Sequence, residues 1–217
     1  MLEEINKTLI EESAQHRLSV IEDPSLQWLT DGELETLNDT LSTAVLDWVC
    51  AKDFLTDRLA ATFNDACQLK VLREDDCLHL ESFEMSQKTA QGSKLRGPGR
   101  LREVAQRANQ QCWIFARSLM PMSSLSAQPQ LRRLNDQPLG LFLKTQQAQR
   151  SDFSFFTIMP ESPLLDSFMK AFPAQKSERL PCLGRCSGFQ WTQGECVVIE
   201  IFMPRFLNAL RVALMAS

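Results

Sequence analysis

The amino-acid sequence predicts an α+β fold in which helices pack on a single antiparallel β-sheet of about six strands. Apolar residues recur at helical spacing up to about residue 63, and from about residue 67 the pattern changes to the alternation of half-buried strands. Short turns separate the strand-like stretches, such as the tight turn at Gln193-Gly194. Short turns favour hairpins, and therefore antiparallel neighbours.

The N-terminal part is predicted to be helical. Residues 2–18 form an amphipathic pattern, and a turn at residues 23–25 separates it from two short helices between Leu26 and Val49. Asp31 and Ser42 are the expected N-caps of those two helices. A further helix is expected over residues 53–63, where apolar residues again recur on one side.

Six stretches alternate as strands do: 67–74, 100–107, 112–120, 151–159, 183–191 and 195–203. Asn109-Gln110 is the expected tip of the hairpin that joins the second and third. Residues 86–99 are rich in Gly and Pro and are predicted to be a loop, and 123–140 to hold short helical pieces. Residues 160–181 contain four prolines around an apolar helical turn, as expected either of a lid or of an insertion that covers the sheet.

Composition and charge exclude several classes of function. The chain has 217 residues, of which 44% are hydrophobic and 23% charged, and its net charge is −4. This balance argues against binding to nucleic acid or to anionic lipid. Because the first residues are acidic and no apolar run approaches the ~18 residues of a membrane span, we expect a cytoplasmic protein without membrane insertion. We also expect a monomer, although no sequence feature tests this.

Metal and cofactor chemistry are not expected. The two histidines, His16 and His79, lie far apart, and the seven cysteines contain no CxxC pair, so free thiols in a reducing compartment are the simplest interpretation. No glycine-rich phosphate loop lies between a strand and a helix. The sequence therefore predicts neither a metal nor a cofactor.

Two charged residues interrupt apolar strands. Alternation places Arg117 on the same face as Trp113, Phe115 and Leu119, and Glu200 lies within the apolar run 196–203. A buried guanidinium needs a carboxylate, which either the protein or a ligand could supply. The two residues could form a structural ion pair, or they could help to bind a small aromatic or cyclic carboxylic acid.

Several short motifs occur in an order that resembles the bacterial chorismate pyruvate-lyase family. They are LDWVCAKDFLTDRL (46–59), LRE (101–103), WIFARSLMPMSSL (113–125), QPLGLFL (137–143), RSDF (150–153) and VIEIFMP (198–204). The resemblance covers residues from about 44 to 204. It implies a chorismate lyase-like domain over 44–217, preceded by an N-terminal helical extension over 1–43.

The resemblance also implies a function and a site. Members of the family convert chorismate to 4-hydroxybenzoate and pyruvate, the first committed step of ubiquinone synthesis, without a cofactor. The family's ligand-binding arginines correspond to Arg102 and Arg117, its ligand-contacting glutamate to Glu200, and its backbone contacts to Leu139 and Leu55. In this interpretation, Arg102 holds the ring carboxylate and Arg117 faces the departing enolpyruvyl group. Glu200 is then either the base at C4 or the group that orients the hydroxyl.

Two alternatives remain open at this stage. The first is a non-catalytic module that binds a small carboxylate effector, because sensor domains of bacterial transcription regulators share this fold. The second is a degenerate lyase that only binds 4-hydroxybenzoate and delivers it to a membrane prenyltransferase. Mixing the protein with chorismate and following 4-hydroxybenzoate would separate an enzyme from either alternative.

Overall fold

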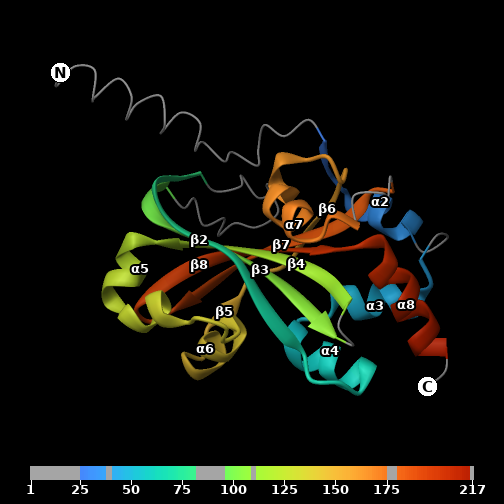
Figure 1. The fold of residues 1–217 in the computed structure, drawn as a ribbon, viewed down its shortest axis with the longest axis horizontal. Helices are drawn as coiled ribbons and strands as arrows, with labels where there is room; N and C mark the ends of the chain where they lie inside the picture. The colour runs from blue at the N-terminus through green and yellow to red at the C-terminus, as the bar shows by residue number, and fades with distance from the viewer. Residues whose placement is uncertain (1–24, 38–40, 82–95, 109–110, 175–179, 216–217) are drawn as a thin grey trace.

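The structure is a computed structural model that describes residues 25–37, 41–81, 96–108, 111–174 and 180–215 (Figure 1). The expected helix over 2–18, most of the loop predicted over 86–99 and the expected hairpin tip Asn109-Gln110 lie outside the described residues. Most of the turn predicted at residues 23–25 lies outside them as well. The described end of the predicted loop, residues 96–99, is part of a strand, Arg96–Ala108, and not a loop.

Within the described residues, eight strands form one antiparallel sheet. They are β1 (Leu26–Trp28), β2 (Gln68–Glu81), β3 (Arg96–Ala108), β4 (Gln111–Pro121), β5 (Gln149–Arg150), β6 (Ser154–Ile158), β7 (Cys182–Trp191) and β8 (Gly194–Phe202). Their order is β1-β6-β7-β8-β4-β3-β2, and β5 also pairs with β7. This confirms the predicted fold class. Six of the strands correspond to the six predicted stretches, and β1 and β5 are additional.

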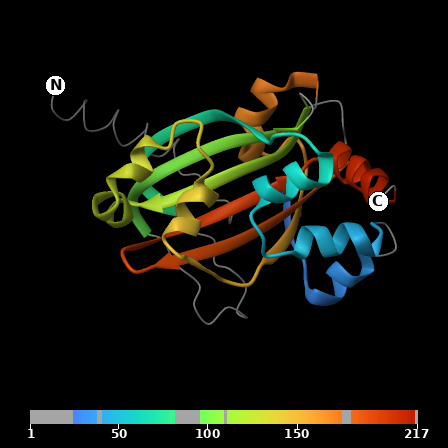
Figure 2. The ribbon, with the colours of Figure 1, turned by 90° about the horizontal axis from the view of Figure 1, so that it is seen from below.

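Helices cover both faces of this sheet. The α-helices are α2 (Asp31–Thr36), α3 (Thr43–Cys50), α4 (Leu55–Phe63), α5 (Met122–Ala127), α6 (Leu139–Thr145), α7 (Asp166–Ala171) and α8 (Pro204–Met215), and the 3-10 helices are η3 (Pro129–Arg133) and η4 (Pro163–Leu165). Figure 1 shows α4 and α6 below the sheet and α7 above it. In Figure 2, which is seen from below, α4 and α6 lie in front of the strands.

The N-terminal prediction needs two corrections. Leu26–Trp28 is strand β1 rather than the start of a helix, because its backbone pairs with β6 and Trp28 packs edge-on against Phe156 with ring centroids 5.3 Å apart. The N-cap of α2 is Thr30 rather than Asp31, and Thr30 forms a capping box with Glu33. Ser42 does occupy the N-cap position of α3.

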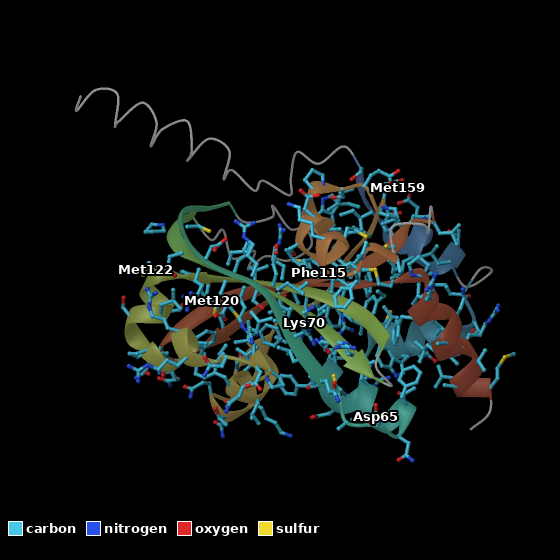
Figure 3. All side chains as sticks on the ribbon, viewed as in Figure 1. Asp65, Lys70, Phe115, Met120, Met122 and Met159 are labelled. Carbon is cyan, nitrogen blue, oxygen red and sulfur yellow. The ribbon has the colours of Figure 1, made fainter. Side chains whose placement is uncertain are left out.

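Alternation along β4 divides the core between the two faces of the sheet. Phe115 lies near the middle of the sheet and contacts Phe168 of α7, with ring centroids 5.8 Å apart (Figure 3). Met120, with the opposite parity, packs with Leu125 of α5 and Phe142 of α6. One face is therefore closed by η4 and α7. The other is covered by α3, α4 and α8 toward one end and by α5, η3 and α6 toward the other.

The strand register brings a set of polar residues to this second face. Arg102 of β3 is paired with Ser118 of β4. Ala116, two residues before Ser118, is paired with Glu200 of β8, and Glu200 is paired with Arg185 of β7. Since residues opposite each other in a sheet share a face, Arg102, Glu200 and Arg185 all point to the side covered by α4 and α6.

Candidate functional site

A small cavity lies on this face, between the middle of the sheet and the first turns of α4 and α6. It encloses about 60 Å³. Its polar lining consists of Thr56, Arg102, Gln106, Ser118, Arg150 and Glu200. The rest of the lining is largely apolar and includes Leu55, Leu69, Val104, Leu139, Val198 and Phe189. A few charged groups in an apolar cavity are typical of a site that orients a small polar ligand.

Arg102 is fixed by three hydrogen bonds and is almost fully buried. Its Nε donates to Glu74 Oε1 at 2.8 Å, and its Nη2 donates to the backbone oxygens of Asn135 and Gln137 at 2.7 and 3.1 Å. Burial lowers the pKa of Arg102, and Glu74 opposes this change, so the guanidinium stays charged. Only Nη1 has no partner among the described residues, and so one nitrogen of Arg102 is left for a ligand.

In Glu200, one carboxylate oxygen accepts hydrogen bonds within the protein and the other does not. Its Oε2 accepts hydrogen bonds from Arg185 Nε at 2.7 Å and from Arg150 Nη2 at 2.9 Å. Its Oε1 has no partner among the described residues. The carboxylate is therefore held by one oxygen while the other remains available to a donor on a ligand.

The surroundings keep Glu200 ionised. Burial raises the pKa of this carboxyl, but Arg185 and Arg150 together outweigh burial and hold the pKa below its ordinary value. An ionised carboxylate accepts hydrogen bonds and cannot donate them. A carboxylate with a lowered pKa is also a weak base. Glu200 is thus better suited to accept a hydrogen bond from a hydroxyl than to remove a proton from carbon.

Two further arginines surround Glu200. Arg150 lines the cavity, and its Nε donates to Ser187 Oγ at 2.9 Å. Arg185 lies behind Glu200, is fully buried and donates to the backbone oxygens of Val49 and Ala51. Because two guanidinium groups face one carboxylate, this part of the site carries a net positive charge, which favours an anionic ligand.

Both guanidinium groups lie over the ring of Phe153. The distances from Cζ to the ring centroid are 4.5 Å for Arg150 and 4.2 Å for Arg185. An aromatic face attracts a cation and holds a planar guanidinium in place. Phe153 therefore helps to fix the two arginines that bind Glu200.

Leu139 and Leu55 line the cavity as the first residues of α6 and α4. The first amides of a helix have no acceptor within the helix. The residues before them, Pro138 and Phe54, provide no side-chain cap. The backbone of both helix starts is therefore placed where it could contact a ligand, as the resemblance implied for Leu139 and Leu55.

Arg117 does not line the cavity, contrary to the sequence expectation. It lies on the opposite face, where its Nε donates to Glu103 Oε1 at 2.7 Å and its Nη2 to the backbone oxygen of Leu164 at 3.1 Å. The structural ion pair considered for Arg117 does occur, but its partner is Glu103 rather than Glu200. Arg102 and Arg117 therefore do not converge on one ligand.

A β-bulge explains this difference. Counting back along a regular hairpin from a tip at 109–110 would place Arg117 opposite Arg102 and on the same face. The register instead shifts between Gln106 and Arg107, so that Arg117 is opposite Glu103. A shift of one residue moves every later side chain of a strand to the other face.

Neither Arg150 nor Arg185 was assigned a role from the sequence. Arg150 was inside the RSDF motif, but nothing in the sequence shows that β5 brings it to Glu200. Counting back from the predicted turn at Gln193-Gly194 would have paired Arg185 with Phe202. The turn is instead formed by Thr192 and Gln193, with Trp191 opposite Gly194, and this register pairs Arg185 with Glu200. The useful signal in the sequence was a lone arginine in an apolar strand, which needs a carboxylate partner.

In the described part of the chain, no three His, Cys, Asp or Glu side chains come together as a metal ion would require. None of the helices there has the length and apolar character needed to cross a bilayer.

The fold and the site define a class of α+β proteins that hold a small molecule between one antiparallel sheet and its covering helices. The particular family is shown by the sequence comparisons. The sequence profile named "Chorismate lyase" matches residues 25–212, and this chain belongs to the chorismate lyase family. The match begins just before β1, which is consistent with the pairing of β1 and β6 in the sheet.

Two relatives illustrate the degree of similarity. A protein of Pseudoalteromonas atlantica named "Probable chorismate pyruvate-lyase" is 27% identical over 184 residues, which are 82% of this chain and 86% of the relative. A protein of the same name from a Shewanella species is 30% identical over 190 residues, which are 86% of this chain and 90% of the relative.

A comparison with solved structures supports the fold. The crystal structure of PhnF from Mycobacterium smegmatis superposes with a TM-score of 0.51 at 11% sequence identity, and the match covers 71% of this chain and 65% of PhnF. At this identity the similarity concerns the fold alone.

Proposed function

We propose that this protein is a chorismate pyruvate-lyase that converts chorismate to 4-hydroxybenzoate and pyruvate, the first committed step of ubiquinone synthesis. The observation that carries the proposal is that Arg102 and Glu200 line one cavity, and that each has one polar atom without a partner among the described residues. A ring with a carboxylate at one end and a hydroxyl at the other would satisfy both. The family membership supports the same substrate.

The spacing of the two residues suits such a ring. Arg102 and Glu200 lie on strands separated by β4 and are offset by two residues in register. With a strand spacing of about 4.8 Å and a rise of about 3.4 Å per residue, their Cα atoms are roughly 12 Å apart. Both side chains can thus reach a ligand between them from opposite ends, Arg102 at the ring carboxylate and Glu200 at the hydroxyl.

The reaction is an elimination that needs no change of oxidation state overall. The C3–O bond to the enolpyruvyl group breaks, the hydrogen on C4 leaves as a proton, and a proton is added to the enolpyruvyl carbon to give pyruvate. The ring becomes aromatic and keeps its C4 hydroxyl. Holding the substrate in one orientation can contribute ~7–11 kcal/mol to such a step, so positioning would supply much of the rate enhancement.

We assign Glu200 to the C4 hydroxyl rather than to proton removal at C4. Its pKa is held low by Arg185 and Arg150, and a weak base in contact with a hydroxyl orients it by accepting its hydrogen bond. The second carboxylate of chorismate, on the enolpyruvyl group, requires a second cation. Arg150 lines the cavity beside Glu200 and takes this role in place of Arg117.

The direct test is incubation with chorismate, with 4-hydroxybenzoate measured by chromatography and pyruvate by reduction with lactate dehydrogenase. Equal amounts of both products, absent with heat-denatured protein, are expected. If 4-hydroxybenzoate binds but no product forms, the protein is instead a binding module of the same fold. If neither binding nor turnover occurs, the assignment of the cavity to this ligand is wrong.

A further inference from the structure

Three consecutive carboxylates on β2, Glu74, Asp75 and Asp76, are each bonded to an arginine. An acidic run on a strand is usually a solvated surface. Here Glu74 is bonded to Arg102 itself. Asp76, which has the same parity, is bonded to Arg100, whereas Asp75 is bonded to Arg73. The run is therefore part of the structure that surrounds the cavity.

Glu74 contacts Arg102 directly. The two residues are opposite each other in the β2–β3 ladder, and the Nε–Oε1 distance is 2.8 Å. The Arg102 side chain is 1% exposed and that of Glu74 is 24% exposed, so the bond is formed at the edge of the buried region. A charge-assisted bond in such a position is strong and directional.

Asp76 contributes through the segment that follows α5. It accepts from Arg100 Nε at 3.0 Å and from Arg132 Nη1 at 2.8 Å, which ties η3 to the edge of the sheet. The turn after η3 contains Asn135, whose φ of 49° is left-handed. This turn presents the two backbone oxygens that hold Nη2 of Arg102.

These bonds decide which atom of Arg102 a ligand can reach. Nε is occupied by Glu74, and both hydrogens of Nη2 are directed to backbone oxygens, so a carboxylate cannot bind along the Nε–Nη2 edge. Only Nη1 remains. Without Glu74, only the two bonds of Nη2 would hold the guanidinium. It could then tilt about its last side-chain torsion, and Nη1 would be less firmly oriented.

We propose that Glu74 is a positioning residue that acts through Arg102: it fixes the guanidinium so that Nη1 alone is presented to the ring carboxylate of the ligand. The inference rests on the proposed function for the identity of that ligand. Glu74 lies on the edge strand β2 and does not line the cavity, so the site would depend on a residue outside its own lining.

The test compares three variants. Glu74→Ala removes the acceptor, Glu74→Gln keeps an acceptor without the charge, and Asp75→Ala removes a neighbouring carboxylate that is bonded to Arg73. Titration calorimetry with 4-hydroxybenzoate should show about tenfold weaker binding for Glu74→Ala, which corresponds to the loss of one hydrogen bond. The loss should be smaller for Glu74→Gln, and Asp75→Ala should bind as the wild type does. Unchanged binding by Glu74→Ala, or an equal loss in Asp75→Ala, would overturn the proposal.

A double-mutant cycle separates positioning from a general structural effect. The Arg102→Lys background has no guanidinium to orient, so adding Glu74→Ala should cause little further loss of affinity for 4-hydroxybenzoate. Saturation-transfer NMR measures this affinity, because it detects binding in the millimolar range. A full tenfold loss in that background would show that Glu74 does not act through Arg102. In steady-state kinetics the loss should appear mainly in KM for chorismate, because the carboxylate is bound in both the ground and transition states.

The Nε–H resonance of Arg102 in a ¹H–¹⁵N spectrum provides a readout that does not depend on the ligand. It is assigned by its absence in Arg102→Lys. It should shift and exchange faster with water in Glu74→Ala, and stay unchanged in Asp75→Ala. If the wild-type protein neither bound 4-hydroxybenzoate nor consumed chorismate, the proposed function would fail, yet this resonance would still decide the role of Glu74. An unchanged resonance in Glu74→Ala would overturn it.

Discussion

The two faces of the sheet each bury an arginine and a glutamate, but use them differently. On the face closed by η4 and α7, Arg117 and Glu103 are bonded to each other, and Glu103 Oε2 is sealed from solvent with no partner in the described part of the chain. On the cavity face, Arg102 and Glu200 are bonded to other groups, and each keeps one uncommitted atom at the cavity. All four residues are buried, and the residue types are the same on both faces. The difference is that the unbonded atoms of the cavity face belong to residues that line a cavity, whereas Arg117 and Glu103 do not line it.

The two faces show how a structural ion pair differs from two charged residues that are arranged to bind a ligand. A closed ion pair neutralises its own charges and leaves nothing for a ligand, so it affects stability when one partner is lost. Residues that are held in place by second partners can offer a fixed donor or acceptor at low cost in conformational entropy. Substitutions on the two faces should therefore have different consequences for stability and for binding.

The largest effect is expected for Arg117→Ala. Removal of the guanidinium leaves Glu103 as an uncompensated buried charge, which should cost about 3–5 kcal/mol in the free energy of unfolding. Urea denaturation measures this loss. Replacing both partners with apolar residues (Arg117→Met with Glu103→Leu) should recover most of it. A stable Arg117→Ala protein with a selective loss of chorismate binding would show that the two faces are not divided as described.

Arg102→Ala is expected to act on binding. Loss of its charged hydrogen bond should weaken 4-hydroxybenzoate binding by about 100-fold, or about 3 kcal/mol. Stability should change less than in Arg117→Ala, because the released Glu74 is partly exposed and can be hydrated. Calorimetric titration and urea denaturation on the same preparation test both statements, with Arg133→Ala, at an exposed position of η3, as the control.

Glu200→Gln keeps the shape of the side chain and removes its charge. Turnover of chorismate should fall by roughly 30-fold, or about 2 kcal/mol, because the C4 hydroxyl loses an ionised acceptor and two arginines lose their counter-charge. Initial rates at saturating chorismate measure the change. Wild-type turnover in this variant would remove Glu200 from the reaction.

The smallest effect concerns pH. The pKa of Glu200 is below its ordinary value of 4.5, so the ionised form, and the stability that it contributes, is present above that value and is lost only as the pH falls through the lower folded-state pKa. Turnover should therefore show no Glu200-dependent decrease between about pH 7 and pH 5. An inflection in that interval that Glu200→Gln abolishes would mean that Arg185 and Arg150 do not keep the carboxylate ionised.

The fold could largely be predicted from the sequence because alternation reports burial directly. The main strands were found in this way, but the β7–β8 turn was predicted one residue too late, because Thr192 and Gln193 form it and Gly194 begins β8. Leu26–Trp28 was misassigned because its spacing with later leucines fits a helix, while its actual partner, β6, is more than 120 residues away. Local periodicity contains no information on such a pairing.

The site could be predicted only in part, for a related reason. Arg102, Glu200, Leu139 and Leu55 do line one cavity, but Arg117 was moved to the other face by a bulge that alternation does not reveal. Arg150 lies on a two-residue strand whose position depends on pairing with β7. Which atoms of Arg102 and Glu200 stay free depends on partners from four distant segments, and this requires the structure.

The edge of the sheet formed by β2 has a consequence beyond the cavity. Among the described strands, β2 lies at one edge of the sheet. Its register with β3 shifts between Val71 and Arg73 and again between Cys77 and Leu80, and the acidic residues 74–76 lie between these two irregularities. Irregular, charged edges resist docking against a second sheet, since opposed carboxylates repel and the backbone groups fall out of step. The residues that orient Arg102 should thus also protect the folded molecule against edge-to-edge aggregation.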